Sequence, residues 1–200
     1  MAYSVYPAPS SGITVSDGNN AGWNLGETQW EQISEYKNAT TVANIDFSSI
    51  PQTYRGLKLQ IVGLTLSTAD QVYLRINNDS TVSTYSRFGR AERSNNSGTI
   101  TVIQQHSQNK IQLNGDQNVE SGNTFHCFIH FPNYTSSNVK KLEWNSYYQT
   151  AVGAETFSAE GTFRKGTTTP AITSLRLLTN STNMYFDGNE ALSASLWGIK

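Results

Sequence analysis

The residue types that most often carry catalysis or bind metals are sparse in this chain, which has one cysteine and three histidines among 200 residues. Cys127 lies in the run Phe125-His-Cys-Phe-Ile-His-Phe131, where apolar residues alternate as in a half-buried strand. Because successive strand residues face opposite sides of a sheet, Cys127 cannot easily share a site with His126 or His130. We therefore expect a small buried thiol rather than a Cys/His nucleophile or a metal site.

Three glutamates, Glu143, Glu155 and Glu160, could in principle supply the carboxylate pair of a glycosidase. Isolated carboxylates are far more often solvated surface charges, so this is the weaker interpretation. The chain lacks zinc-ligand spacings, the Gly-x-Ser-x-Gly motif and a phosphate-binding glycine loop. The runs Asn77-Asn-Asp79 and Asp187-Gly-Asn189 fit tight turns better than calcium loops. The sequence thus predicts no catalytic residue, no cofactor and no metal site, with a small depolymerase as an alternative from another class.

Three aromatic residues, Trp144, Tyr147 and Tyr148, stand close together in the run Leu142-Glu-Trp-Asn-Ser-Tyr-Tyr-Gln149. On a strand, Trp144 and Tyr148 share one face while Tyr147 lies on the other. A stacked aromatic face with amide neighbours suits a sugar, but it equally suits a sandwich core or a subunit interface. We therefore treat the three residues as candidate interface or glycan-contact aromatics.

The elements that must position these residues are short strands separated by turns rich in Asn, Asp, Gly and Ser. Leu57, Leu59 and Ile61 alternate cleanly, for example, and no helical period appears between the strands. The pattern predicts an all-β, antiparallel β-sandwich that is jelly-roll-like, a topology common in capsid proteins and lectins. The main expected strands are Ala43–Phe47, Leu57–Thr68, Gln71–Asn77, Thr99–Gln105, Lys110–Asn114, Thr124–Phe131, Val139–Tyr148, Glu155–Phe163, Ile172–Thr179, Met184–Phe186 and Leu192–Ile199.

The overall charge is low, with 14% charged residues and a net charge of −1. This balance gives no basic surface to bind a phosphate backbone, so we expect no nucleic-acid partner. The run Arg87-Phe-Gly-Arg-Ala-Glu-Arg93 is interpreted as a solvated loop or a salt-bridged subunit contact. No apolar run is long enough to span a bilayer, and the first residues lack the features of a signal peptide, so we expect neither a membrane partner nor an export signal.

The first 25 residues are predicted to form an extended N-terminal arm ahead of a sandwich domain at residues 26–200. Prolines and glycines interrupt this segment, which is too polar to order itself. Such an arm either frays or docks onto a neighbour. The candidate contact residues of the arm are Tyr3, Val5, Tyr6, Pro7, Ile13 and Val15.

Three phrases of the sequence carry a family resemblance. They are Phe47-Ser-Ser-Ile-Pro-Gln-Thr-Tyr-Arg-Gly-Leu57, Leu74-Arg-Ile-Asn-Asn-Asp79 and Leu196-Trp-Gly-Ile-Lys200. In this order and at these separations they resemble phrases of a family of tailed-bacteriophage virion structural proteins.

The resemblance implies a non-enzymatic virion protein that decorates or cements the capsid exterior as an oligomer, with a homotrimer as the preferred state. Its expected partners are the major capsid protein and copies of itself. Its expected location is the capsid surface, or less often the tail, after synthesis in the host cytoplasm. The alternative is a tail-fibre or tail-tip receptor-binding module that recognises a host surface glycan through an aromatic and amide face.

Overall fold

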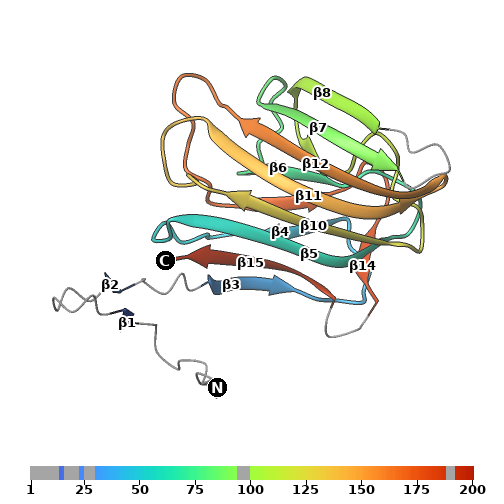
Figure 1. The fold of residues 1–200 in the computed structure, drawn as a ribbon, viewed down its shortest axis with the longest axis horizontal. Coiled ribbons are helices and arrows are strands. Elements are labelled where there is room, and N and C mark those ends of the chain that lie inside the picture. The colour runs from blue at the N-terminus through green and yellow to red at the C-terminus, as the bar shows by residue number, and fades with distance from the viewer. Residues whose placement is uncertain (1–13, 16–22, 25–29, 94–99, 188–191) are drawn as a thin grey trace, which may run out of the picture.

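The fold is all-β, as the sequence predicts. A computed structural model describes residues 14–15, 23–24, 30–93, 100–187 and 192–200, which contain strands and no helix (Figure 1). The strands are β1 (Thr14–Val15), β2 (Trp23–Asn24), β3 (Trp30–Tyr36), β4 (Asn44–Phe47), β5 (Gly56–Leu66), β6 (Tyr73–Ile76), β7 (Tyr85–Arg93), β8 (Ile100–Gln108), β9 (Ile111–Gln112), β10 (Thr124–Phe131), β11 (Lys140–Thr150), β12 (Gly153–Phe163), β13 (Leu175–Leu178), β14 (Met184–Phe186) and β15 (Ser193–Ile199).

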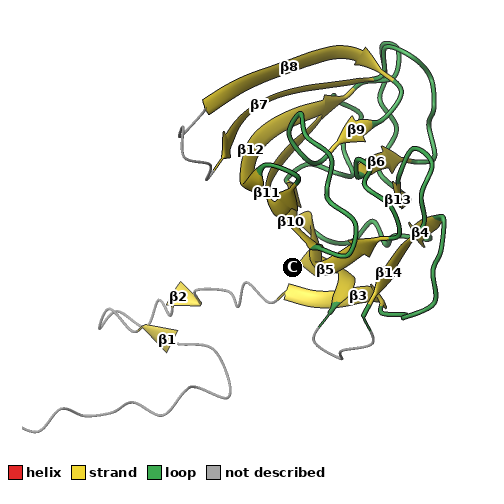
Figure 2. Cartoon of the chain, turned by 90° about the vertical axis from the view of Figure 1, so that its right-hand side faces the viewer, coloured by secondary structure: helices red, strands yellow, loops and turns green. Residues whose placement is uncertain are grey.

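Two sheets face each other in a sandwich-like arrangement. The larger sheet has nine strands in the order β3-β15-β5-β10-β11-β12-β7-β8, with β14 also paired to β5. The smaller sheet has four strands in the order β4-β13-β6-β9, and β1 pairs with β2 separately. The larger sheet curves around the smaller one, so it has an inner face toward the core and an outer face toward solvent (Figure 2).

Strict alternation along the strands decides which side chains enter the core. In β11, all eleven residues alternate between buried and exposed positions, and β10 alternates in the same way. This is the period of two that a strand with one covered face requires. The period-two spacing of the sequence predicts that nine apolar residues face one core, and each is at most 1% exposed: Leu57, Leu59, Ile61, Val72, Leu74, Ile76, Phe125, Ile129 and Phe131.

Of the two interpretations of the segment from Arg87 to Arg93, a solvated loop or a salt-bridged subunit contact, the structure contradicts the loop, because the segment forms most of β7. Arg87 is buried on the inner face, where its guanidinium donates hydrogen bonds to the Gln112 carbonyl at 3.0 Å and to Gln105 Oε1 at 2.9 Å. Burial lowers the pKa of Arg87 to about 10, so the group is still charged at neutral pH. A charged side chain thus occupies a core position because backbone and amide oxygens surround it.

Two of the three phrases that carry the resemblance lie side by side. The first phrase runs into β5 and the third forms most of β15, and these strands pair with Leu196 opposite Leu59 and Gly198 opposite Leu57. The Tyr54 ring packs on Gly198 so closely that a Cβ atom there would lie 2.4 Å from the ring. Only glycine fits at this contact.

The second phrase ties the smaller sheet to the segment before β13. Asn77 has a positive φ of 53°, and its Oδ1 accepts hydrogen bonds from the backbone N–H groups of Thr173 at 2.8 Å and Ser174 at 3.1 Å. Asparagine suits this place because it tolerates a left-handed conformation and bonds to nearby backbone. The turn predicted around Asn77 is confirmed.

Removing a core side chain should destabilise the fold strongly. Leu74→Ala is expected to lower the free energy of unfolding by about 2–5 kcal/mol, because it leaves a cavity in the packed core. Chemical denaturation would measure the change. The control is Val82→Ala, where the valine is 66% exposed and a change within about 0.5 kcal/mol is expected. A loss below that value at Leu74 would contradict the assigned register.

Asp79 should make stability depend on pH in the acid range. Burial acts to raise the pKa of Asp79, but Lys165 Nζ at 2.6 Å and the Thr81 N–H at 2.8 Å outweigh it and hold the pKa below its ordinary value of 3.8. The carboxylate therefore contributes stability at pH values above 3.8, and this contribution disappears as the pH falls through the lower pKa of the folded state.

Asp79→Asn should accordingly lower stability at neutral pH by about 1–3 kcal/mol, because a buried acceptor loses its charge and its ion pair. The gap between the two proteins should shrink as the pH falls below the ordinary aspartate pKa. Urea titrations across the acid range would follow it, with exposed Asp187→Asn as the control. A gap that stays constant with pH would contradict the ionic role of Asp79.

Candidate binding face

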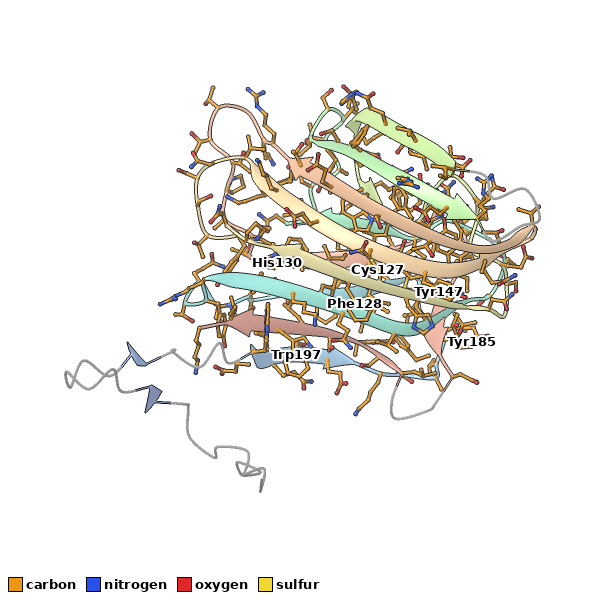
Figure 3. All side chains as sticks on the ribbon, in the orientation of Figure 1. Cys127, Phe128, His130, Tyr147, Tyr185 and Trp197 are labelled. Carbon is orange, nitrogen blue, oxygen red and sulfur yellow. The ribbon has the colours of Figure 1, made fainter. Side chains whose placement is uncertain are left out.

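The outer face of the larger sheet brings together polar and aromatic side chains from distant parts of the sequence. Cross-strand register places one row of directly opposed residues across six neighbouring strands. In order, the row is Trp197, Lys58, His130, Glu143, Glu160 and Phe88. In Figure 3 this face is toward the viewer, and the labelled Phe128, His130, Tyr147 and Trp197 lie on its part formed by β10, β11 and β15.

One hollow on this face, which we call the Trp30 hollow, has a volume of about 310 Å³. The Lys58 ammonium lies between two aromatic rings, 5.8 Å from the Trp30 centroid and 5.6 Å from the Phe128 centroid. The His130 ring meets Trp30 edge-on at 6.5 Å. The hollow is lined by Trp30, Lys58, Phe128, Ile129, His130, Glu143 and Asn145.

The chemistry of the Trp30 hollow suits a small polar ligand with an apolar side. The rings of Trp30 and Phe128 are partly exposed and offer flat apolar surfaces. Glu143 can accept hydrogen bonds, Asn145 can both donate and accept them, and Lys58 donates. A concave site with aromatic walls and a few polar groups is the usual composition of a small-molecule site.

A second hollow, of about 250 Å³, shares Glu143 and adds Glu160, His106 and Lys141. Glu143 and Glu160 are directly opposite in β11 and β12. Like charges opposed in this way destabilise a sheet, and the cationic Lys141 in the same hollow counters the repulsion. The structure therefore brings together two of the three glutamates considered as a catalytic pair.

The third glutamate, Glu155, lies on the inner face and is fully buried. It accepts hydrogen bonds from Arg93 Nε at 2.7 Å and from the Tyr148 hydroxyl. Burial and the neighbouring Glu155 carboxylate raise the pKa of Tyr148, which keeps the phenol protonated. Glu155 therefore belongs to a structural network inside the fold and cannot act together with Glu143 at the surface.

The three candidate aromatics separate between the two faces. Trp144 and Tyr148 are buried in the core, where Trp144 Nε1 donates to the Leu113 carbonyl at 3.0 Å. Tyr147 is exposed on the outer face, with its ring centroid 6.5 Å from that of His126. Of the three, only Tyr147 is placed to contact a glycan or a partner.

Cys127 is fully buried and has no disulfide partner. Burial raises the pKa of its thiol well above the ordinary value, so the thiol is a poor nucleophile. No three His, Cys, Asp or Glu side chains among the described residues gather closely enough to hold a metal ion. The part of the chain that the structure describes also contains no helix long and apolar enough to cross a membrane.

Most of the predicted arm contacts, namely Tyr3, Val5, Tyr6, Pro7 and Ile13, lie outside the described residues. Val15 belongs to β1 and pairs with Trp23 of β2. Sequence reasoning missed Trp30, Lys58 and Phe128 as site residues. Phe128 carried a signal, because it is an aromatic residue on the polar side of the alternating run from Phe125 to Phe131.

Comparison with known proteins adds no assignment: the chain matches no family model, no curated protein and no solved structure.

Proposed function

We propose that this protein is a non-enzymatic structural protein of a tailed-bacteriophage virion, which decorates or cements the capsid exterior as an oligomer. Its proposed partners are the major capsid protein and further copies of the same chain, with a homotrimer as the state that the resemblance favours. The observation that carries the proposal is the placement of the three phrases that resemble this family. All of them hold residues that fix the fold.

The residues of the three phrases make structural contacts, and no catalytic role is proposed for them. Leu57 and Gly198 face each other across paired strands, and Tyr54 covers Gly198. Asn77 anchors a distant loop through its side-chain oxygen. Apolar residues of the phrases, among them Phe47, Leu57 and Leu196, lie in the core. This placement supports a shared framework, and a jelly-roll relationship is the finer part of the same proposal.

The outer face offers a surface for assembly. Large apolar side chains that stay exposed on it come from four strands. Exposed apolar groups that gather on one face mark interaction surfaces more often than they mark a free monomer surface. These residues are Phe88, Ile100, Val102, Phe128 and Tyr147.

The N-terminal arm is proposed to supply part of the contact with the shell. Order gained on binding lets a short arm cover a large surface, and several arms on one oligomer raise avidity. Deleting residues 1–22 should leave a folded domain that no longer adds to capsids lacking the protein. Cosedimentation with such capsids, followed by electron microscopy, would measure occupancy.

Two outcomes would count against this proposal. Full occupancy of the capsids by protein that lacks residues 1–22 would show that the arm is not needed for binding. Immunogold labelling of the intact protein only at the tail end of particles would contradict the decoration role and favour the receptor-binding module of the tail.

The second candidate function is a receptor-binding module of the tail that recognises a host surface glycan. The Trp30 hollow favours it, because the C–H face of a sugar ring can stack on Trp30 or Phe128 while Glu143 and Asn145 bond to its hydroxyl groups. Its volume of about 310 Å³ lies at the small end of the range of about 300–1,000 Å³ for ligand sites, which suits one or two sugar units.

Glycan binding would depend on Phe128 in a measurable way. An array of neutral and acidic hexose oligosaccharides, followed by calorimetry with the best binder, should show at least a tenfold loss of affinity for Phe128→Ala. The control Val152→Ala removes an exposed valine in the turn between β11 and β12 and should bind normally. No binding by the unmodified protein, or equal binding by both variants, would exclude this site.

A further inference from the structure

We propose that β8 is a self-association edge, through which two copies of this chain pair antiparallel about a two-fold axis and continue the larger sheet from one copy into the other. The inference goes beyond the proposed function by naming a specific contact between two copies of the chain. It is carried by the position, sequence and exposure of β8, so it can fail while the virion assignment stands.

The position of β8 leaves one side of the strand without a sheet partner. β8 is the last strand in the order of the larger sheet, and within the described residues β7 is its only paired strand. Figure 2 shows β8 at the rim of the sheet, beyond β7. Every edge strand presents a row of backbone N–H and C=O groups that another strand can bind. β8 has nine residues, and its row of backbone groups is regular from Ile100 to Gln105, before a bulge at Ser107.

The sequence of β8 lacks the charges and prolines that protect edges, and its one bulge, at Ser107, lies near the end of the strand. The run Ile100-Thr-Val-Ile-Gln-Gln-His-Ser-Gln108 contains no Lys, Arg, Asp, Glu, Pro or Gly. Monomeric proteins usually protect a long edge with charges, proline, a bulge or a very short strand. Three β-branched apolar residues, with Thr101 between two of them, also favour extended pairing.

The opposite edge of the same sheet shows the contrast. β3 carries Glu31 and Glu35, which form ion pairs with Lys200 at 2.6 Å and with Lys37 at 3.3 Å. In the smaller sheet, the edge strand β4 has only four residues and includes Asp46, paired with Arg176. Compared with the described edge strands β3 and β4, β8 is therefore both long and free of charged residues.

The exposed side chains of β8 fit a second copy of the same strand. Ile100 is 53% exposed and Val102 is 64% exposed, and both lie on the outer face with Gln104 and His106. When two β8 strands pair about a two-fold axis, residues of this face meet residues of the same face. No like charges oppose each other, and the valine and isoleucine lose contact with water.

A contact of this kind joins an even number of copies. The same patch serves both partners, so the interface closes with two chains. The homotrimer that the resemblance favours would need a different contact. The mass of the protein in solution therefore separates the two arrangements.

A charge placed on this edge should break the contact. Light scattering coupled to size-exclusion chromatography should find a concentration-dependent dimer for the full chain, and Val102→Lys should weaken it at least tenfold. Val152→Lys, which replaces another exposed valine away from β8, should leave the dimer intact. Thermal unfolding of both variants shows whether each remains folded.

Cysteine cross-linking gives a second test that does not depend on weakening the interface. The only native thiol, Cys127, is fully buried, so an engineered surface cysteine is the reactive one in the folded chain. Val102→Cys or Gln104→Cys should form an intermolecular disulfide, because residues nearest a two-fold axis come within disulfide range. Val152→Cys should not.

Three results would overturn the inference. They are a monomer at all accessible concentrations, a trimer, or a dimer that tolerates Val102→Lys and cross-links at neither position. None of them bears on where the protein lies on a virus particle, which electron microscopy of particles tests separately.

Discussion

The unequal size of the two sheets is the constraint on which the rest of the structure depends. Four strands cannot cover both faces of a nine-stranded sheet, so only one face of the larger sheet can exclude water. Along β11, this places Leu142 and Trp144 inside and leaves Glu143 and Asn145 outside. The same separation that builds the core thus produces a second, uncovered surface, and the candidate site and the exposed apolar residues both lie there.

The inner face becomes polar at the end of the smaller sheet. Near β7, β9 and the segment after it lie over the larger sheet, and their backbone oxygens surround the guanidinium of Arg87. Arg93 joins the same segment to the sheet through Asp116 and buried Glu155. Tyr148 accepts a hydrogen bond from the Gly115 N–H at 2.6 Å. Because buried polar groups are costly when unpaired, this network fixes one position of the segment and disfavours others.

Local alternation made much of the fold predictable. It identified the faces of β5, β10 and β11, and it placed Trp144 and Tyr148 together with Tyr147 opposite. Alternation does not identify β7, because three arginines and a glutamate in this segment suggest exposure, whereas Arg87 is buried. Arg87 satisfies its donors with oxygens from residues about 25 positions away, and no local pattern contains that information.

The site was less predictable than the fold, for a related reason. The Trp30 hollow combines Trp30 and Lys58 with Phe128 and Asn145, from four different strands. Their proximity depends on strand order, and in particular on β15 lying between β3 and β5. A period of two tells which side of a sheet a residue faces, but it does not tell which strands are neighbours. The outward position of Phe128 was readable from the sequence, whereas its neighbours were not.

The position of β15, late in the sequence but between β3 and β5 in the sheet, also determines when the larger sheet can form during synthesis. Strands β3 and β5 are among the first described strands to leave the ribosome, yet the strand that joins them contains residues 193–199. Leu59 must therefore wait for Leu196, made 137 residues later, before that side of its strand is covered. Until then the nascent chain exposes two open edges next to an incomplete core, a state prone to wrong pairing. Assembly of the larger sheet can therefore be completed only after β15 has been made, and wrong strand pairing before that point would lower the yield of folded protein.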